Sequence, residues 1–270
     1  MLGVSPILAP LASSALLALA GWRSIFWTLA AFSLALLALV AFSLTETAPR
    51  ARFRAGEHAS APASLARNFV FLLSERRYLA YMSVNCITLT GIYAFVSSAA
   101  FVIVDALGYS ARDFSLCFAF VALGNMLGAI ASSRLVMHYG MVHYGMDRMI
   151  RIGTALAFGS GAVMAALGWL RIDHLAATVL PAFVFFFAAN FVFPHATAGA
   201  LSPYPRISGA ASSLLGFVQL ASGAAASYVL GAIYDGTQRP MATAFGLAGT
   251  AALLAYLFLV YPLPAPERKE

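Results

Sequence analysis

The stretch Leu175–Gly199, with the sequence LAATVLPAFVFFFAANFVFPHATAG, decides the fold. It is 25 residues long and contains no aspartate, glutamate, lysine or arginine. A helix needs about 20 apolar residues to cross a hydrocarbon core about 30 Å thick. The apolar residues are continuous rather than alternating with polar ones, which favours a helix over a strand of a membrane barrel. We therefore expect a transmembrane helix here.

Seven further stretches of similar character lie along the chain. They are Leu2–Ala20, Ser24–Thr45, Tyr78–Val104, Phe114–Met137, Ile150–Leu170, Ser208–Tyr234 and Met241–Pro262. The whole chain is 61% apolar and only 10% charged, whereas soluble proteins have about 25% charged residues. This composition excludes a water-soluble fold, a disordered chain and a secreted disulfide scaffold. The sequence predicts an all-α polytopic membrane protein with eight transmembrane helices.

The basic residues are distributed unevenly between the two sides of these spans. Of the 16 arginines and lysines, four fall on one side and the remaining 12 on the other. The four are Arg23, Arg112, Arg171 and Arg239. Because cytoplasmic loops carry the excess of basic residues, we expect a multi-pass plasma (inner) membrane protein with both termini in the cytoplasm. Arginines scattered between spans fit a lipid bilayer as the partner and argue against nucleic acid, despite a formal charge of +6.

One long connection divides the chain. Residues 46–77 are rich in Arg, Ala, Ser and Pro and predict a basic cytoplasmic linker. Within it, Leu65–Leu73 carries an apolar stripe beside arginines and predicts a short amphipathic helix on the membrane surface. The expected units are the last two helices of one bundle (1–45), the linker (46–77), a complete six-helix bundle (78–262) and a cytoplasmic tail (263–270).

Specific strings narrow this architecture. Residues 5–10 (SPILAP), 21–27 (GWRSIFW) and 45–47 (TET) resemble the fifth and sixth helices of the Bcr/CflA drug-resistance transporters of the major facilitator superfamily. Residues 208–219 (SGAASSLLGFVQ) resemble their eleventh helix. The resemblance covers essentially the whole chain but only the last eight of the family's twelve helices. It implies an N-terminally truncated form that lacks four helices, or one that needs a partner chain to supply them.

Two local patterns depart from that family. The fifth-helix antiporter motif usually has paired glycines, but here Pro6 and Pro10 are followed by Ser13 and Ser14, which still permit close helix packing. Residues 137–146 (MHYGMVHYGM) repeat one unit, which we interpret as a tandem duplication in a surface loop. The alternative, a metal site at the two histidines, has poor ligand spacing, so no metal is expected. Beside this loop, we expect Arg134, Asp147 and Arg148 to form a cytoplasmic latch.

Uncharged polar residues lie inside the expected spans, whereas all ten acidic residues fall in loops, tails or span edges. Helical spacing places several of these polar residues on common faces, together with small residues. The candidates for the substrate pathway are Tyr81, Asn85, Thr88, Asn125, Asn190 and Gln219, and those for helix packing on the seventh span are Gly216 and Gly223. The same residues could instead join helices by interhelical hydrogen bonds, and the sequence leaves both interpretations open.

The sixth span contains features with two interpretations. Pro181 and Pro194 each remove a backbone hydrogen bond, so we expect them to bend the helix, either for packing or for a rocking motion. His195 could relay protons or simply bond to a neighbouring carbonyl. The glycine pairs Gly124/Gly128 and Gly246/Gly249 predict close approach of helices.

The resemblance implies efflux of a small-molecule drug or metabolite, hydrophobic or amphipathic, in exchange for protons. The proton gradient would be the energy source, and no cofactor is expected. In the relatives, the proton-coupling charges lie in the first and fourth helices, which this chain lacks, so we expect it not to transport alone. The alternatives are an inert remnant or a half-transporter. A membrane-embedded transferase is disfavoured because the sequence contains no catalytic motif, so no catalytic residue is expected.

Overall fold

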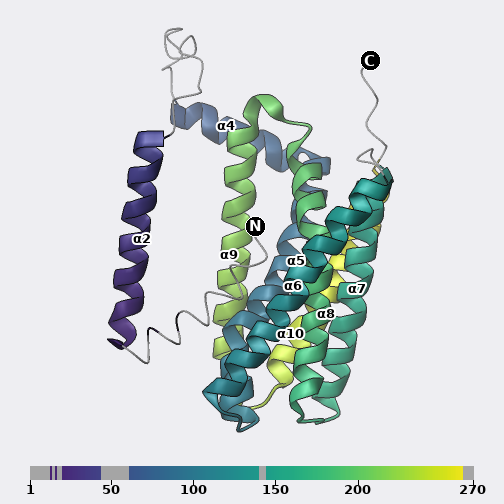
Figure 1. Ribbon diagram of the computed structural model, residues 1–270. Helices are drawn as coiled ribbons and strands as arrows, with labels where there is room; N and C mark the ends of the chain where they lie inside the picture. Colours follow the sequence, from purple (N-terminus) through teal and green to yellow (C-terminus); the bar gives the residue numbers. More distant parts are fainter. Residues whose placement is uncertain (1–12, 14–15, 17–19, 44–60, 140–143, 264–270) are drawn as a thin grey trace.

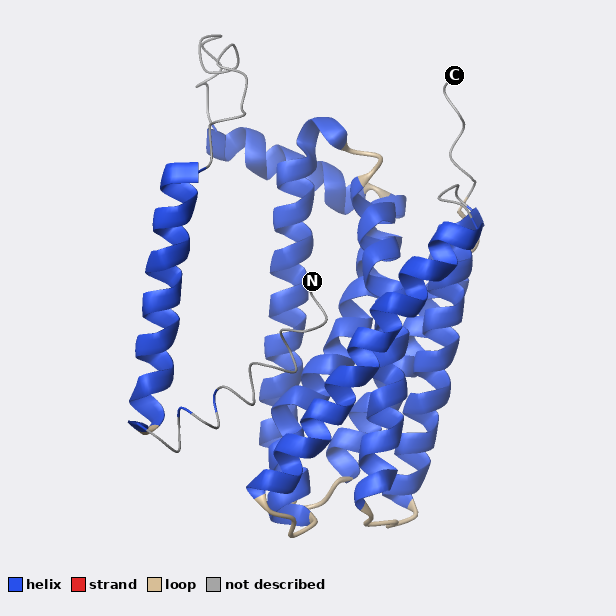
Figure 2. Cartoon of the chain, in the orientation of Figure 1, coloured by secondary structure: helices blue, strands red, loops and turns tan. Residues whose placement is uncertain are grey.

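The computed structural model describes residues 13, 16, 20–43, 61–139 and 144–263 of the chain. Within these residues the chain is entirely helical and contains no strand, as Figure 2 shows. The helices are α2 (Trp22–Ser43), α4 (Ala61–Ser74), α5 (Arg76–Ala100), α6 (Ala111–Tyr139), α7 (Tyr144–Trp169), α8 (Leu175–Leu201), α9 (Ser208–Ala232) and α10 (Arg239–Ala255). Two π-helical turns, η1 (Phe101–Ala106) and η3 (Tyr256–Val260), extend α5 and α10, and a 3-10 turn, η2 (Pro205–Ile207), precedes α9.

Seven of the described helices are long and apolar enough to cross a membrane: α2, α5 with η1, α6, α7, α8, α9 with η2, and α10 with η3. This confirms a polytopic α-helical membrane protein. The first expected span, with Pro6, Pro10 and Ser14, lies almost wholly outside the described residues, so the eighth helix stays a prediction. The boundaries agree with expectation to within a few residues except in α7, which begins at Tyr144 and so includes Asp147 and Arg148. A helix can continue past the hydrocarbon core, where charged residues are tolerated.

Helices α5–α10 pack into one bundle, whereas α2 stands apart from it (Figure 1). Within the bundle, α5 contacts α8, α9 and α10, while α7 packs between α8 and α10. None of the residues of α2 is buried against the rest of the described chain. Its apolar surface therefore has no counterpart among the described helices.

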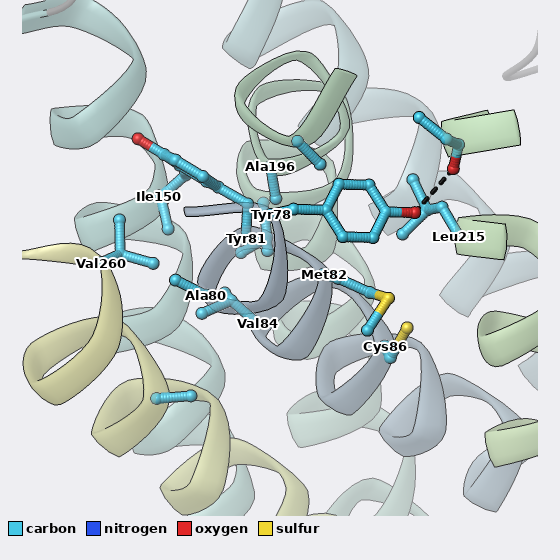
Figure 3. Close-up of a cluster of buried hydrophobic side chains, with 14 of the residues drawn as sticks. Tyr78, Ala80, Tyr81, Met82, Val84, Cys86, Ile150, Ala196, Leu215 and Val260 are labelled. Carbon is cyan, nitrogen blue, oxygen red and sulfur yellow. Dashed lines mark hydrogen bonds between the residues drawn. The ribbon is translucent and has the colours of Figure 1, made fainter. Parts of the chain in front are cut away.

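Two clusters of buried side chains hold the bundle together. One surrounds Tyr78, whose hydroxyl donates a hydrogen bond of 2.6 Å to the carbonyl of Ala211 and so joins α5 to α9 (Figure 3). The other is rich in phenylalanine, and the rings of Phe185 in α8 and Phe245 in α10 have centroids 4.3 Å apart. Both clusters include side chains of α5, α7, α8 and α10, so these four helices share a continuous set of buried contacts.

Glycine pairs mark the closest helix contacts, as their spacing predicts. A Cβ on Gly124 would lie 2.6 Å from the carbonyl oxygen of Phe183 in α8, and one on Gly128 would overlap the backbone of Phe187. On α10, Gly246 and Gly249 lie against α7 in the same way. At these contacts the two backbones are so close that no side chain fits between them. Such close approach increases van der Waals contact between the helices, which matters because the hydrophobic effect does not drive helices together within a bilayer.

The helix expected at residues 65–73 is present as part of α4, which lies across the end of α9 at a steep angle to the spans (Figure 1). Its Leu72 is fully buried, while Val70 is 68% exposed. Near its end, the Tyr204 hydroxyl donates a hydrogen bond of 3.3 Å to Glu75. Burial, and next the Glu75 carboxylate, raise the pKa of Tyr204 to about 12, so this tyrosine stays protonated. The amphipathic helix is thereby fixed to the bundle.

The structure also refines two expectations for the chain. Arg76 and Arg77, assigned by the sequence to the linker, lie in the first turn of α5, because a membrane helix can begin in the headgroup region, where arginines are tolerated. The helix α8 is continuous through both Pro181 and Pro194. The remainder of the linker before residue 61 lies outside the described residues, as does the tail after residue 263.

Candidate functional site

Five uncharged polar side chains from four helices form what we call the polar strip: Asn85, Asn125, Asn190, Thr197 and Gln219. They come from α5, α6, α8 and α9, whereas α7 and α10, which pack against each other, contribute none. On α8, Asn190 and Thr197 are two turns apart on one face. The strip is therefore confined to the surface that these four helices share.

Asn85 is the centre of the first part of the strip. Its side-chain amide donates hydrogen bonds to the hydroxyl of Thr197 at 2.9 Å and to the carbonyl of Phe193 at 3.3 Å. Its side-chain oxygen accepts a hydrogen bond of 2.5 Å from Gln219. Asn85 is fully buried, while Thr197 and Gln219 are half-buried. One side chain thus joins α5 to both α8 and α9.

The second part of the strip joins α6 to α8. Asn190 donates hydrogen bonds to the side-chain oxygen of Asn125 at 2.6 Å and to the carbonyl of Phe186 at 2.9 Å. Beside this pair lies a cavity of about 290 Å³ between α5, α6 and α8. Its walls are apolar except for Asn125, and they include Ile92, Phe118 and Phe186. An apolar cavity with one amide at its edge suits a small amphipathic molecule.

The polar strip carries no formal charge. Each member is an amide or a hydroxyl, and each bonds to another member of the strip. The acids that the structure describes within the spans, Asp105, Asp113 and Asp147, lie toward the helix ends. In this part of the chain, the middle of the bundle can offer hydrogen bonds to a substrate but no titrating carboxylate.

The other candidates on α5 lie elsewhere. Tyr81 packs its ring against Gly199 of α8, and the Arg77 guanidinium lies 5.9 Å from the centroid of the ring. Thr88 is fully buried, and its hydroxyl bonds only to the carbonyl of Val84 in the same helix. Neither residue joins the hydrogen-bond network of the strip, so of the three candidates on this helix only Asn85 is hydrogen-bonded to other helices in that network.

The candidates for helix packing fall into three groups. Gly223 lies against the ring of Tyr93, whereas a Cβ on Gly216 would meet no atom within 4 Å. Pro181 is buried and Pro194 is exposed. Ser13 is half-buried. The other residues of the fifth-helix motif, Pro6, Pro10 and Ser14, lie outside the described residues. Their conformational roles stay predictions.

The latch of Arg134, Asp147 and Arg148 stays a prediction, but Asp147 has a partner that the sequence did not reveal. Asp147 on α7 accepts a hydrogen bond of 3.0 Å from the hydroxyl of Tyr256 in η3. Arg134 is exposed near the end of α6, and Arg148 follows Asp147 on the exposed side of α7. Tyr256 is 109 positions away from Asp147 in the chain, and no local spacing connects the two.

Other polar groups are accounted for structurally. The ring of His195 is buried, and its Nδ1 lies 3.0 Å from the carbonyl oxygen of Phe191 one turn earlier. Cys86 and Cys117 are free and buried. The described residues contain no group of three histidine, cysteine or acidic side chains that could hold a metal ion. Part of the repeated loop at 137–146, including one of its histidines, lies outside them.

Comparison with known proteins identifies what this chain is similar to. Residues 1–227 match the family model described as Major Facilitator Superfamily. The bicyclomycin resistance protein homolog of Haemophilus influenzae is 28% identical over 262 residues, which is 95% of this chain and 62% of that protein. Multidrug resistance protein D of Escherichia coli is 28% identical over 226 residues, covering 83% of this chain and 53% of that protein.

A third relative is also longer than this chain. The multidrug resistance protein MdtL of Vibrio parahaemolyticus is 24% identical over 266 residues, covering 98% of this chain and 63% of the relative. The chain thus spans between 53 and 63% of the length of these three relatives.

Proposed function

Because this chain belongs to the major facilitator superfamily, we propose that it forms the C-terminal part of a drug/proton antiporter whose substrate pathway runs along the polar strip. It is a multi-pass inner-membrane protein and a transporter rather than an enzyme. The observation that carries the proposal is the gathering of Asn85, Asn125, Asn190, Thr197 and Gln219 from four helices onto one surface.

The substrate class follows from the walls of the strip. The cavity beside Asn125 is apolar, and the strip offers amide and hydroxyl groups without charge. Such a surface complements small hydrophobic or amphipathic compounds that carry a few hydrogen-bonding groups. Relatives named for bicyclomycin resistance and multidrug resistance support this class. We propose bicyclomycin as the first compound to test.

The proton-coupling groups, in this proposal, lie outside the polar strip. Proton antiport needs a group that titrates within the membrane, and the strip contains only neutral amides and hydroxyls. Four further helices, either preceding this sequence or supplied by a partner chain, would complete the N-terminal bundle. The absence of buried residues in α2 supports this arrangement, since its apolar surface would then pack against those helices. Both termini of the chain would face the cytoplasm.

Reconstitution tests this proposal directly. Purified chain in liposomes with an imposed pH gradient is expected to accumulate no bicyclomycin beyond empty liposomes, because the proposal places the coupling groups and part of the pathway on the four further helices. Co-reconstitution with the first four helices of the Haemophilus influenzae relative is expected to produce gradient-driven uptake that a protonophore abolishes. The intact relative serves as the positive control.

Two results would contradict the proposal. Gradient-driven uptake by the chain alone would show that the four helices are dispensable. Failure of the completed assembly, with the two parts shown to co-purify and the intact relative active, would remove the assignment as a drug/proton antiporter.

A further inference from the structure

Another, larger hollow in the bundle is lined by none of the five residues of the polar strip. It is a groove of about 770 Å³ between α9 and α10, with α5 as its floor. The two helices make few direct contacts with each other, because α9 packs on α5 and α10 packs mainly on α7. Alanines line both sides, Ala225 and Ala226 on α9 and Ala244 and Ala251 on α10, so the space between the helices stays open.

The groove has the length of one lipid chain. Along α10 its lining runs from Arg239 to Ala251, and 12 residues of helix rise about 18 Å. Half of a hydrocarbon core of about 30 Å is about 15 Å, the depth that the acyl chains of one leaflet occupy. The groove therefore extends from the membrane surface to about the middle of the bilayer.

Polar groups are concentrated at the outer end of the groove. Trp169 donates a hydrogen bond of 3.1 Å from its indole nitrogen to the hydroxyl of Thr243. The guanidinium of Arg239 lies over the Trp169 ring, 5.5 Å from its centroid. Tryptophan and arginine at the end of a span are typical of the headgroup region of a membrane. The ring covers one face of the guanidinium, whose N–H groups lie in the plane of the group and suit an anion such as a phosphate.

A carboxylate lies at the same end. Asp235 lines the groove, and its Oδ1 accepts hydrogen bonds from the hydroxyl of Thr237 at 2.6 Å and from the backbone N–H of Thr237 at 3.0 Å. These bonds, together with the nearby Arg239, lower the pKa of Asp235, so it is ionised at neutral pH. The mouth of the groove thus carries one positive and one negative group side by side.

We propose that this groove binds a zwitterionic phospholipid of the adjacent leaflet. One acyl chain lies between α9 and α10, the phosphate contacts Arg239 and the ammonium group contacts Asp235. A lipid with an anionic headgroup would meet the same arginine but also the repulsion of Asp235, so the pair of charges selects phosphatidylethanolamine over phosphatidylglycerol. The site is separate from the polar strip and does not depend on the transport proposal.

Native mass spectrometry tests the proposal on the full chain. The protein is taken from nanodiscs that contain equal amounts of phosphatidylethanolamine and phosphatidylglycerol. We expect one retained phosphatidylethanolamine, with retention reduced at least fivefold by Arg239→Gln and by Ala225→Phe, which fills the groove from an exposed position. Asp235→Asn is expected to remove the preference between the two lipids without removing binding.

Arg171→Gln is the matched control, since Arg171 is an exposed arginine at the same end of the bundle but outside the groove. It is expected to retain lipid as the unaltered chain does. Equal retention by all variants would overturn the proposal, as would absence of any retained lipid or a preference of the unaltered chain for phosphatidylglycerol. Circular dichroism of each variant shows whether the helices remain intact.

Discussion

Gly128→Leu is expected to separate α6 from α8 and to lower the stability of the bundle by about 3 kcal/mol or more, the upper end of the cost of overpacking. A Cβ at this position would overlap the backbone of Phe187, which cannot move aside as a flexible side chain could. For a chain of this size, we expect the midpoint of thermal unfolding in detergent to fall by roughly 6 to 12 °C.

Gly216→Leu is the control for this substitution. It adds the same side chain to a glycine of α9, where a Cβ would meet no atom within 4 Å. The unfolding midpoint is expected to stay close to that of the unaltered chain. Equal midpoints for Gly128→Leu and the unaltered chain would show that α6 and α8 are not in close contact in the folded protein.

Asn85→Leu is expected to destabilise the chain by roughly 2 kcal/mol, since interhelical hydrogen bonds in membranes contribute about 0.6 kcal/mol each on average and up to about 1.7. The substitution removes three bonds at once, to Thr197, Phe193 and Gln219. It also leaves the half-buried Gln219 amide without its partner, which adds a desolvation cost. The midpoint of thermal unfolding measures the effect.

Thr88→Val is the matched control on the same helix. Thr88 is as deeply buried as Asn85, but its hydroxyl bonds only to the carbonyl one turn earlier in α5, a bond that does not stabilise the helix, so we expect a much smaller loss than for Asn85→Leu. A double-mutant cycle with Gln219→Leu isolates the bond between the two helices. Strict additivity of Asn85→Leu and Gln219→Leu would mean that the two side chains do not interact.

The transmembrane spans could be predicted from the sequence because each is a continuous run of apolar residues long enough to cross a bilayer. Leu175–Gly199 has to be a membrane helix, since 25 uncharged, mostly apolar residues fit few other environments, and α8 occupies Leu175–Leu201. The sequence locates the end of a helix less accurately where charged residues flank the apolar stretch. The sequence assigned Arg76 and Arg77 to the linker, but the start of a membrane helix can extend into the headgroup region and retain such residues.

The hydrogen-bond partners within the candidate site could not be predicted from the sequence in the same way. Helical spacing places Tyr81, Asn85 and Thr88 on one face, but it does not say which of them forms hydrogen bonds to other helices. That depends on how α8 is rotated, and α8 is apolar over most of its circumference, so its sequence gives little information on this rotation. The partner of Asp147 is missed for a related reason, since Tyr256 comes from a helix more than a hundred residues away.

The polar strip has two interpretations, a substrate pathway and a set of hydrogen bonds that only join helices. The bonds between Asn85, Gln219 and Thr197 would stabilise the bundle whether or not a substrate passes. The cavity beside Asn125 supports the pathway, because it leaves room for a small molecule next to the strip. The two interpretations differ in whether water reaches the strip.

Cysteine labelling measures that difference directly. In a background in which Cys86 and Cys117 are replaced by alanine, Asn125→Cys and Gln219→Cys are treated in membranes with a charged, water-soluble maleimide. Thr250→Cys on α10 is the control, a half-buried position whose hydroxyl bonds only to Gly246 in its own helix. If the strip lines a substrate pathway, the first two cysteines are labelled at least tenfold faster than the control. Equal, slow labelling at all three positions would contradict a pathway and leave the strip as a purely structural contact.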